Sequence, residues 1–329
     1  YARQVARHFG VSHHQERLSA DTMREILPEV IGLLDEPFAD ASVIPTYLLS
    51  RFTRRYVTVA LGGDGGDELL AGYDPFEAHK WAGVYERLPA LLRRGLIEPL
   101  VARLPVSHRN MSFDFKARQF IKGMGYPRAL RNQVWLGAFS FEEQKNLLAP
   151  EVLQAAGEAW SPYGDITKLM DGRKFPDNLA ELIYLYSNFY LAEDILAKVD
   201  RASMAVSLEV RAPFLDVELA EFINRLPSSY KMHGFKRKHL LKEAMKHRLP
   251  KRIMQRSKKG FGIPLAAWLR AELKPMMQEH LNESRLKKDG LFNHQFVQRL
   301  IHEHLNGTRD HRKQLWTLLV FQMWRERKF

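Results

Sequence analysis

One stretch of the sequence combines glycines and carboxylates at a spacing that could bind a charged ligand. Residues 62–68 read GGDGGDE, so four glycines and three acids fall within seven positions. Glycines let a backbone turn sharply and approach a ligand closely. Clustered carboxylates need a cation, a proton or a metal beside them. This combination indicates a site for a nucleotide with its magnesium ion.

Two other interpretations of residues 62–68 compete with the first. Glycine and aspartate clusters commonly form solvated turns, and the local pattern leaves that alternative open. Calcium-binding nonapeptide arrays need several tandem copies, whereas this chain has a single copy. Acids at alternate positions followed by a glycine, as in an EF-hand, are missing. Calcium is therefore disfavoured.

The elements around this stretch predict how it is positioned. Residues 56–61 form a short apolar run that contains Val57, Val59 and Leu61, which is typical of a buried strand. Leu69–Ala71 are predicted to open a helix directly after the acidic stretch. Parallel α/β sheets bind ligands beyond the carboxyl ends of their strands, and free N–H groups at a helix N-terminus favour phosphate.

The N-terminal part of the chain alternates helical and extended patterns. Residues 1–9 have helical spacing and Gly10 is a helix stop. Residues 19–34 are helical in pattern, with Pro28 predicted to open a second helix after a break. Pro45 suits the first turn of a further helix that ends near Arg54. Helix, strand, loop and helix in succession predict a doubly wound α/β fold with a parallel sheet.

Amphipathic helical patterns dominate after Tyr73. Ser140 and Glu143 form a predicted capping box. Further helices are predicted over 177–196, 215–226, 236–247, 265–281 and 312–327. We therefore expect one domain over residues 1–329, in which an α/β portion (1–75) is followed by a mainly helical portion (76–329) packed on it.

A second group of charged residues interrupts an apolar segment over residues 196–216. Charges inside such a segment are costly unless they are paired or liganded. A buried ion-pair network would satisfy them, and so would a ligand: Arg201 and Arg211 could hold a phosphate or a carboxylate bidentately. The roles of Glu209, Arg211 and Asp216 stay open.

A third group lies in residues 256–264, which read RSKKGFGIP. Glycines on both sides of Phe261 predict a pliable loop that carries two lysines. Such a lysine can act as a point charge that closes on phosphates. An ordinary basic turn before the next helix is the alternative.

Composition bounds the class of protein. The 329 residues are 45% hydrophobic and 27% charged, as in ordinary globular proteins, and no apolar run approaches the ~18 residues of a membrane span. The absence of cysteine excludes disulfides, thiolate metal sites and a cysteine nucleophile. The net charge of +12 suits either nucleic acid or polyphosphate. Without targeting signals, we expect a cytoplasmic protein.

Taken together, the three groups resemble the synthetase domain of the glutamine-dependent asparagine synthases. The matching segments, in the order of that family and over nearly the whole chain, are DEPFADASVIPTYLLSR, VALGGDGGDELLAGY, KVDRASMAVSLEVRAPFLD, KKGFGIP and DHRKQLWTLLVFQMW. The resemblance implies an ATP-pyrophosphatase, HUP-like α/β fold. It also implies that ATP and Mg²⁺ activate the side-chain carboxylate of aspartate as an acyl-adenylate. Ammonia from glutamine then gives asparagine, AMP and pyrophosphate.

The resemblance also assigns roles to individual residues. Gly62 and Gly63 match the loop that contacts ATP, and Asp64 matches the acidic position linked to forming and consuming the intermediate, where other members carry Glu. Asp67 matches the magnesium-binding aspartate. Lys258 matches the catalytic lysine that stabilises pyrophosphate, and Arg201 matches a basic position near the phosphates.

Some features of the family are missing from this sequence. The Ser-Gly-Gly-x-Asp-Ser pyrophosphate loop does not occur, the glutaminase domain with its N-terminal cysteine is absent, and Gly62 replaces the usual serine. We expect a piece of a longer protein, inactive alone, with these parts upstream. Aspartate and ammonia or glutamine are the expected partners, a homodimer is an open assembly state, and no membrane or nucleic-acid partner is expected.

Three functional alternatives remain at this point. A related amidotransferase could adenylate a different carboxylic acid. The fold could also serve as a non-catalytic ATP-binding module. The basic charge could finally reflect a nucleic-acid binder, which would show steeply salt-dependent binding.

Overall fold

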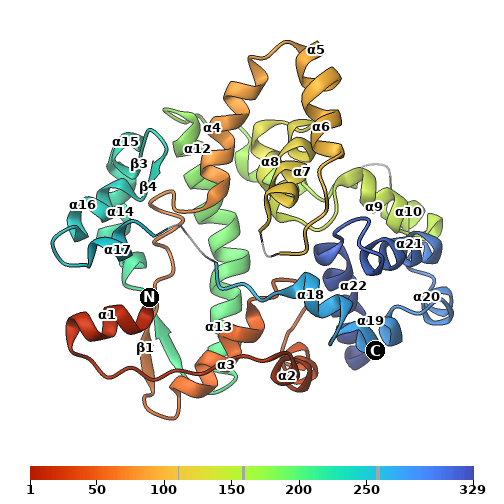
Figure 1. Ribbon diagram of the computed structural model, residues 1–329, viewed down its shortest axis with the longest axis horizontal. Coiled ribbons are helices and arrows are strands. Elements are labelled where there is room, and N and C mark those ends of the chain that lie inside the picture. The colour runs from red at the N-terminus through yellow and green to blue at the C-terminus, as the bar shows by residue number, and fades with distance from the viewer. Residues whose placement is uncertain (110, 158–159, 257–259) are drawn as a thin grey trace. The chain divides into compact units, whose positions relative to one another are not determined.

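The computed structural model describes residues 1–109, 111–157, 160–256 and 260–329 (Figure 1). Two compact units divide the chain: unit 1 comprises residues 1–18, 45–81 and 173–261, and unit 2 comprises residues 19–44, 82–172 and 262–329. Both units use sequence from either side of residue 75, and the division predicted there stays a prediction. No described helix combines the length and the apolar character needed to cross a membrane.

Unit 1 holds all four strands among the described residues. The strands are β1 (Val59–Leu61), β2 (Glu209–Arg211), β3 (Met232–His233) and β4 (Lys236–Arg237). The helices that lie wholly or mostly in this unit are α1 (Ala2–Phe9), α3 (Val43–Thr53), α4 (Asp74–Glu86), α12 (Asn178–Leu185), the π-helix η2 (Tyr186–Leu196), α13 (Ala197–Met204), the 3₁₀ turn η3 (Pro213–Leu215), α14 (Val217–Arg225), α15 (Ser228–Lys231), α16 (His239–Met245) and α17 (Lys251–Met254).

Unit 2 is helical in its described part, apart from an isolated bridge between Leu148 and Phe292. Its helices are α2 (Ala20–Gly32), α5 (Ala90–Leu92), the π-helix η1 (Arg93–Ile97), α6 (Glu98–Ala102), α7 (Phe113–Met124), α8 (Arg128–Leu136), α9 (Phe141–Leu147), α10 (Pro150–Ala156), α11 (Gly164–Met170), α18 (Leu265–Arg270), α19 (Lys274–His280), α20 (Glu283–Asp289), α21 (His294–Leu305) and α22 (Arg312–Lys328).

The parallel sheet is confirmed, and it is small. β1 pairs in parallel with β2 in the register Val59–Glu209, Ala60–Val210 and Leu61–Arg211, and the two arrows lie side by side in Figure 1. The predicted buried strand is wrong in two respects, because β1 has three residues and Leu61 is 74% exposed. Within the described chain β1 pairs with one other strand, β2. The chain is thus an α/β protein dominated by helices.

The helix predicted at Leu69–Ala71 is also wrong. Residues 64–71 form consecutive turns, and the next helix, α4, begins at Asp74. Ala71 adopts φ 53°, outside the helical region, and the Gly72 N–H closes the turn on the Asp67 carbonyl oxygen at 2.7 Å. The acidic stretch therefore does not lead directly into a helix N-terminus.

Other predicted helices are confirmed with adjusted limits. Gly10 caps α1 with φ 65°, and Ser140 and Glu143 form the predicted capping box. Asp177 caps a helix that runs through α12 and η2 to Leu196. The helix predicted over 265–281 is divided into α18 and α19.

Pro28 does not open a second helix. α2 continues through Pro28 from Ala20 to Gly32, with Ser19 as its N-cap. Proline removes one backbone donor and strains a helix interior. Five apolar side chains of α2 are buried along one face, and their packing holds the helix together: Met23, Ile26, Leu27, Val30 and Ile31.

The core of unit 2 surrounds α22. This helix buries Leu315, Trp316, Leu319 and Val320, each at most 2% exposed, and packs against α2, α18, α19 and α21. The Trp316 indole donates to the Ala39 carbonyl oxygen at 2.9 Å. This hydrogen bond satisfies the buried indole N–H, which is the polar group of an otherwise apolar ring.

A lysine at the start of α22 gives unit 2 a predicted pH dependence. The Lys313 ammonium donates to the carbonyl oxygens of Trp135 and Leu136, both at 2.9 Å, at the C-terminal end of α8. Burial lowers the pKa of Lys313 to about 8, and nearby Lys122 and Arg312 act in the same direction. The unfolded state then binds more protons than the folded state between that pH and ~10.4.

We therefore expect the free energy of unfolding to rise with pH over this window, by at most about 3 kcal/mol from Lys313. The carbonyl acceptors favour the charged form, which makes this value an upper limit. Urea unfolding at pH 7.5, 9 and 10.5 measures it, with Lys313→Met as the control that lacks the titrating group. An equal slope in both proteins would contradict the prediction.

Candidate functional site

The acidic stretch lies at the carboxyl end of the parallel sheet. The Gly62 N–H donates to the Arg211 carbonyl oxygen at 2.7 Å, which extends the β1–β2 ladder by one bond. Gly65 has φ 86°, and a Cβ at this position would lie 2.3 Å from Leu215 Cδ2. Residues 62–68 therefore pack against the segment that follows β2. The structure brings the first and second sequence groups together.

Asp64 lies within a partly buried, charged environment. Its Oδ2 is 2.8 Å from the place that a Gly62 Cβ would occupy, so the side chain folds back over its own loop. Burial raises the pKa of the Asp64 carboxyl; the Lys198 ammonium opposes this shift and the Asp67 charge adds to it. Lys198, on α13, is itself only 8% exposed. Sequence reasoning gave Lys198 no separate role, because an apolar segment with charges does not show which of them faces residues 62–68.

Asp67 is held by a lysine that sequence reasoning missed. Lys238 Nζ lies 2.9 Å from Asp67 Oδ1, and the Lys238 N–H donates to the Leu70 carbonyl oxygen at 3.1 Å. The preceding residue, Arg237, donates to the Gly72 carbonyl oxygen at 3.2 Å and pairs with Asp74. The β3–β4 hairpin thus fixes the acidic stretch from a distant part of the sequence.

Glu68 is the most buried acid of the stretch. It is 1% exposed, and the Tyr73 hydroxyl donates to its Oε1 at 2.5 Å. The Tyr73 ring stacks on Tyr186, with centroids 5.3 Å apart, and meets Tyr190 edge-on. Burial raises the pKa of Glu68, while the Tyr73 hydrogen bond lowers it; burial and the Glu68 charge raise the pKa of Tyr73.

Replacement of Tyr73 by Phe is expected to cost about 1–3 kcal/mol of unfolding free energy at pH 8, because a buried carboxylate loses its donor. The folded-state pKa of Glu68 is already raised, and the variant raises it further. The unfolded state contributes equally to both proteins, so the cost should shrink as pH falls through the folded-state pKa values of Glu68 in the two proteins, both of which lie above the unfolded-state value of ~4.3. Chemical unfolding at pH 8 and pH 4.5 measures this difference. In the background of Glu68→Gln the pH dependence should vanish, and its persistence there would contradict the prediction.

The surroundings of Gly63 and Asp67 can be compared with the needs of ATP and Mg²⁺. Gly63 is exposed, with no atom within 4 Å of its would-be Cβ, so a ligand can approach the backbone at the strand end. No group of three His, Asp or Glu side chains that could enclose a metal occurs among the described residues. Mg²⁺ usually takes one or two carboxylates and obtains its other ligands from phosphates and water. Asp67 fits such a site if its carboxylate is shared with, or released by, Lys238.

The sequence also singled out Arg201, Arg211 and Lys258. Arg201 pairs with Asp200 at 2.6 Å, and Arg211 pairs with Glu209 at 2.7 Å. Lys258 lies outside the described residues. The roles predicted for Arg201 and Lys258 stay predictions.

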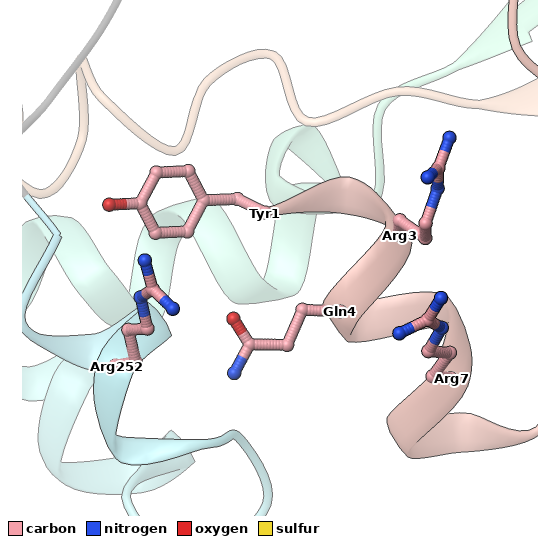
Figure 2. A pocket seen from close by; sticks show the side chains of 5 residues that line it. All are labelled: Tyr1, Arg3, Gln4, Arg7 and Arg252. Carbon is pink, nitrogen blue, oxygen red and sulfur yellow. The ribbon is translucent and has the colours of Figure 1, made fainter.

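Basic side chains of α1 and α17 lie together on the surface of unit 1. A surface pocket of about 320 Å³ is lined there by Tyr1, Arg3, Gln4, Arg7 and Arg252 (Figure 2). The predicted site residues do not contribute to this pocket.

Comparison with known proteins identifies relatives over the whole chain. The family described as asparagine synthase matches residues 1–326. A putative glutamine-hydrolysing asparagine synthetase of Mycobacterium tuberculosis strain H37Rv is 31% identical over 322 residues, which are 96% of this chain and 46% of that protein. Asparagine synthetase 1 of Bacillus subtilis strain 168 is 26% identical over 98% of this chain and 49% of its own length.

A relative with a different name also matches. The protein named amidase chry2 of Gibberella zeae is 22% identical over 90% of this chain and 46% of its own length. The chain thus spans about half the length of the curated relatives that it matches.

Proposed function

Because the chain belongs to the asparagine synthase family, we propose that it is the synthetase part of an ATP-dependent, glutamine-hydrolysing amide ligase. Its proposed reaction activates the side-chain carboxylate of aspartate as an acyl-adenylate and releases pyrophosphate. Ammonia derived from glutamine then forms asparagine and AMP. A glutaminase domain in the same protein is the proposed source of ammonia.

The observation that carries the proposal is the charge pattern around residues 62–68. At the carboxyl end of two parallel strands, the positive charge of Lys198 favours the ionised form of Asp64, and Asp67 is paired with Lys238. Alternating acids and lysines beside an exposed glycine backbone can accept a polyphosphate and its metal ion together. Charge that develops on a departing pyrophosphate would be stabilised by the cationic members of this arrangement.

Each proposed role follows from chemistry that the side chain can perform. Gly62 and Gly63 are proposed to let the backbone at the strand end approach ATP, and Asp64 is proposed to lie near the reacting acyl group. Asp67 would hold Mg²⁺, which supplies charge neutralisation on the phosphates when bound. Arg201 and Lys258 are proposed to bind phosphate, with Lys258 acting on the leaving pyrophosphate.

Pyrophosphate release by the full-length protein tests the proposal. ATP, Mg²⁺, aspartate and ammonia should together yield pyrophosphate, AMP and asparagine in equal amounts, and omission of aspartate should abolish pyrophosphate formation. Glutamine should replace ammonia. Failure to form pyrophosphate with any carboxylic acid in a broad panel would refute an adenylating ligase.

A second candidate differs only in its acyl substrate. Similarity to proteins named amidase favours considering an amidotransferase that activates a different acid. The same pyrophosphate assay across amino acids and other carboxylic acids separates the two. Preference for aspartate supports the first candidate, and preference for another acid supports the second.

A further inference from the structure

The ion pair between Asp67 and Lys238 places an ammonium group on a carboxylate proposed to bind metal. The two charged atoms are 2.9 Å apart, and their side chains are only 15% and 25% exposed. At such a distance in a partly buried site, a positive charge competes directly with a second cation. The pair therefore bears on when a metal can bind.

The backbone is arranged to deliver this ammonium. Lys238 has φ 51°, an unfavourable left-handed conformation for a lysine. Its N–H is anchored to Leu70, and Arg237 is anchored to the Gly72 carbonyl oxygen. These contacts fix the backbone from which the Lys238 side chain reaches Asp67.

Space for the pair is left by a glycine. A Cβ on Gly72 would lie 1.9 Å from Asp67 Oδ1 and 2.3 Å from Lys238 Cε. Any other residue at this position would displace the pair. The anchored backbone of Lys238 and the lack of a side chain at Gly72 thus both favour an ammonium beside the Asp67 carboxylate.

We propose that Lys238 is a positioning residue whose ammonium stays paired with the Asp67 carboxylate until a nucleotide binds. In the nucleotide-free protein the ammonium neutralises the carboxylate and keeps divalent cations away. Phosphate groups would provide Lys238 with another anionic partner, so that Asp67 accepts the metal as part of the metal–nucleotide complex. The inference rests on the proposed function, in which Asp67 holds Mg²⁺.

Metal binding without turnover tests this inference. Mn²⁺ is titrated into the full-length protein without nucleotide, and free Mn²⁺ is measured by electron paramagnetic resonance. Lys238→Met should bind Mn²⁺ at least tenfold more tightly than the wild type, because the competing charge is gone. Lys238→Arg keeps the charge and should bind as weakly as the wild type. With a non-hydrolysable ATP analogue, the advantage of Lys238→Met should disappear.

Matched variants assign the effect to this pair. Lys236→Met removes the same charge from an exposed position on the same hairpin and should leave Mn²⁺ affinity within twofold. Adding Asp67→Asn to Lys238→Met should abolish the gain. Unchanged Mn²⁺ affinity in Lys238→Met, or an equal gain in Lys236→Met, would overturn the inference. Thermal unfolding checks that each variant is folded, and Lys238→Gln serves the same purpose if Lys238→Met does not fold.

The two proposals fail in distinguishable ways. Normal pyrophosphate release with unchanged Mn²⁺ binding in Lys238→Met would refute the role of Lys238 and leave the ligase assignment intact. Absence of pyrophosphate release with any acid would refute the ligase, whatever the Mn²⁺ titrations show.

Discussion

Replacement of Asp64 by Asn in the full-length protein is expected to lower kcat for pyrophosphate release by about 10²–10³-fold, with little change in the KM for ATP. Asn keeps the size of the side chain but removes the charge that lies in the field of Lys198. Loss of one well-placed electrostatic partner at a reacting centre costs about 3–4 kcal/mol of transition-state stabilisation. Steady-state kinetics with separate variation of ATP and aspartate measures both constants.

Stability separates this effect from simple unfolding. Because burial raises the pKa of Asp64, its charged form weakens the folded state above pH ~4, where the unfolded carboxyl is ionised. The neutral Asn removes that penalty, so Asp64→Asn should be at least as stable as the wild type at pH 7.5. Asp64→Glu keeps the charge and should retain activity within tenfold. Near-normal turnover of Asp64→Asn would remove Asp64 from the catalytic residues.

Replacement of Gly72 by Ala is the second large expected effect. The new methyl group would overlap the Asp67 carboxylate and the Lys238 side chain, at 1.9 and 2.3 Å. Overpacking of this kind costs about 1–3 kcal/mol in stability. Displacement of the ion pair should lower kcat by about tenfold or more, since small misplacements of a site are costly. Urea unfolding and the pyrophosphate assay measure the two effects.

Gly83→Ala is the matched control for Gly72→Ala. Gly83 lies inside α4, with no atom within 4 Å of its would-be Cβ. Alanine in an open helical position should stabilise by up to about 1 kcal/mol and leave activity unchanged. Equal behaviour of the two variants would show that the space beside Gly72 is not required for the Asp67–Lys238 pair.

Sequence reasoning located the acidic stretch because its signal is local. The glycine run, in which Gly65 takes φ 86°, and the acids that need counter-charges are visible within residues 62–68 themselves. The parallel sheet and the capping box at Ser140 were likewise predicted from neighbouring residues and are confirmed, although β1 is shorter and more exposed than predicted. The helix predicted from Leu69 failed because apolar residues in a tight turn can be buried as well as those in a helix.

The family and the α/β class could be predicted from the sequence, since short motifs in a fixed order carry that information, and the same motifs singled out residues 62–68 as the candidate site. The cation beside Asp67 and the ring that supports Tyr73 depend instead on tertiary packing. Asp67 pairs with Lys238, and Tyr73, whose hydroxyl donates to Glu68, stacks on Tyr186. Such partners depend on how distant segments fold together, and a lysine in the sequence carries no mark of the carboxylate that it will neutralise. Burial has the same origin, and burial is what shifts the pKa values of Asp64 and Glu68.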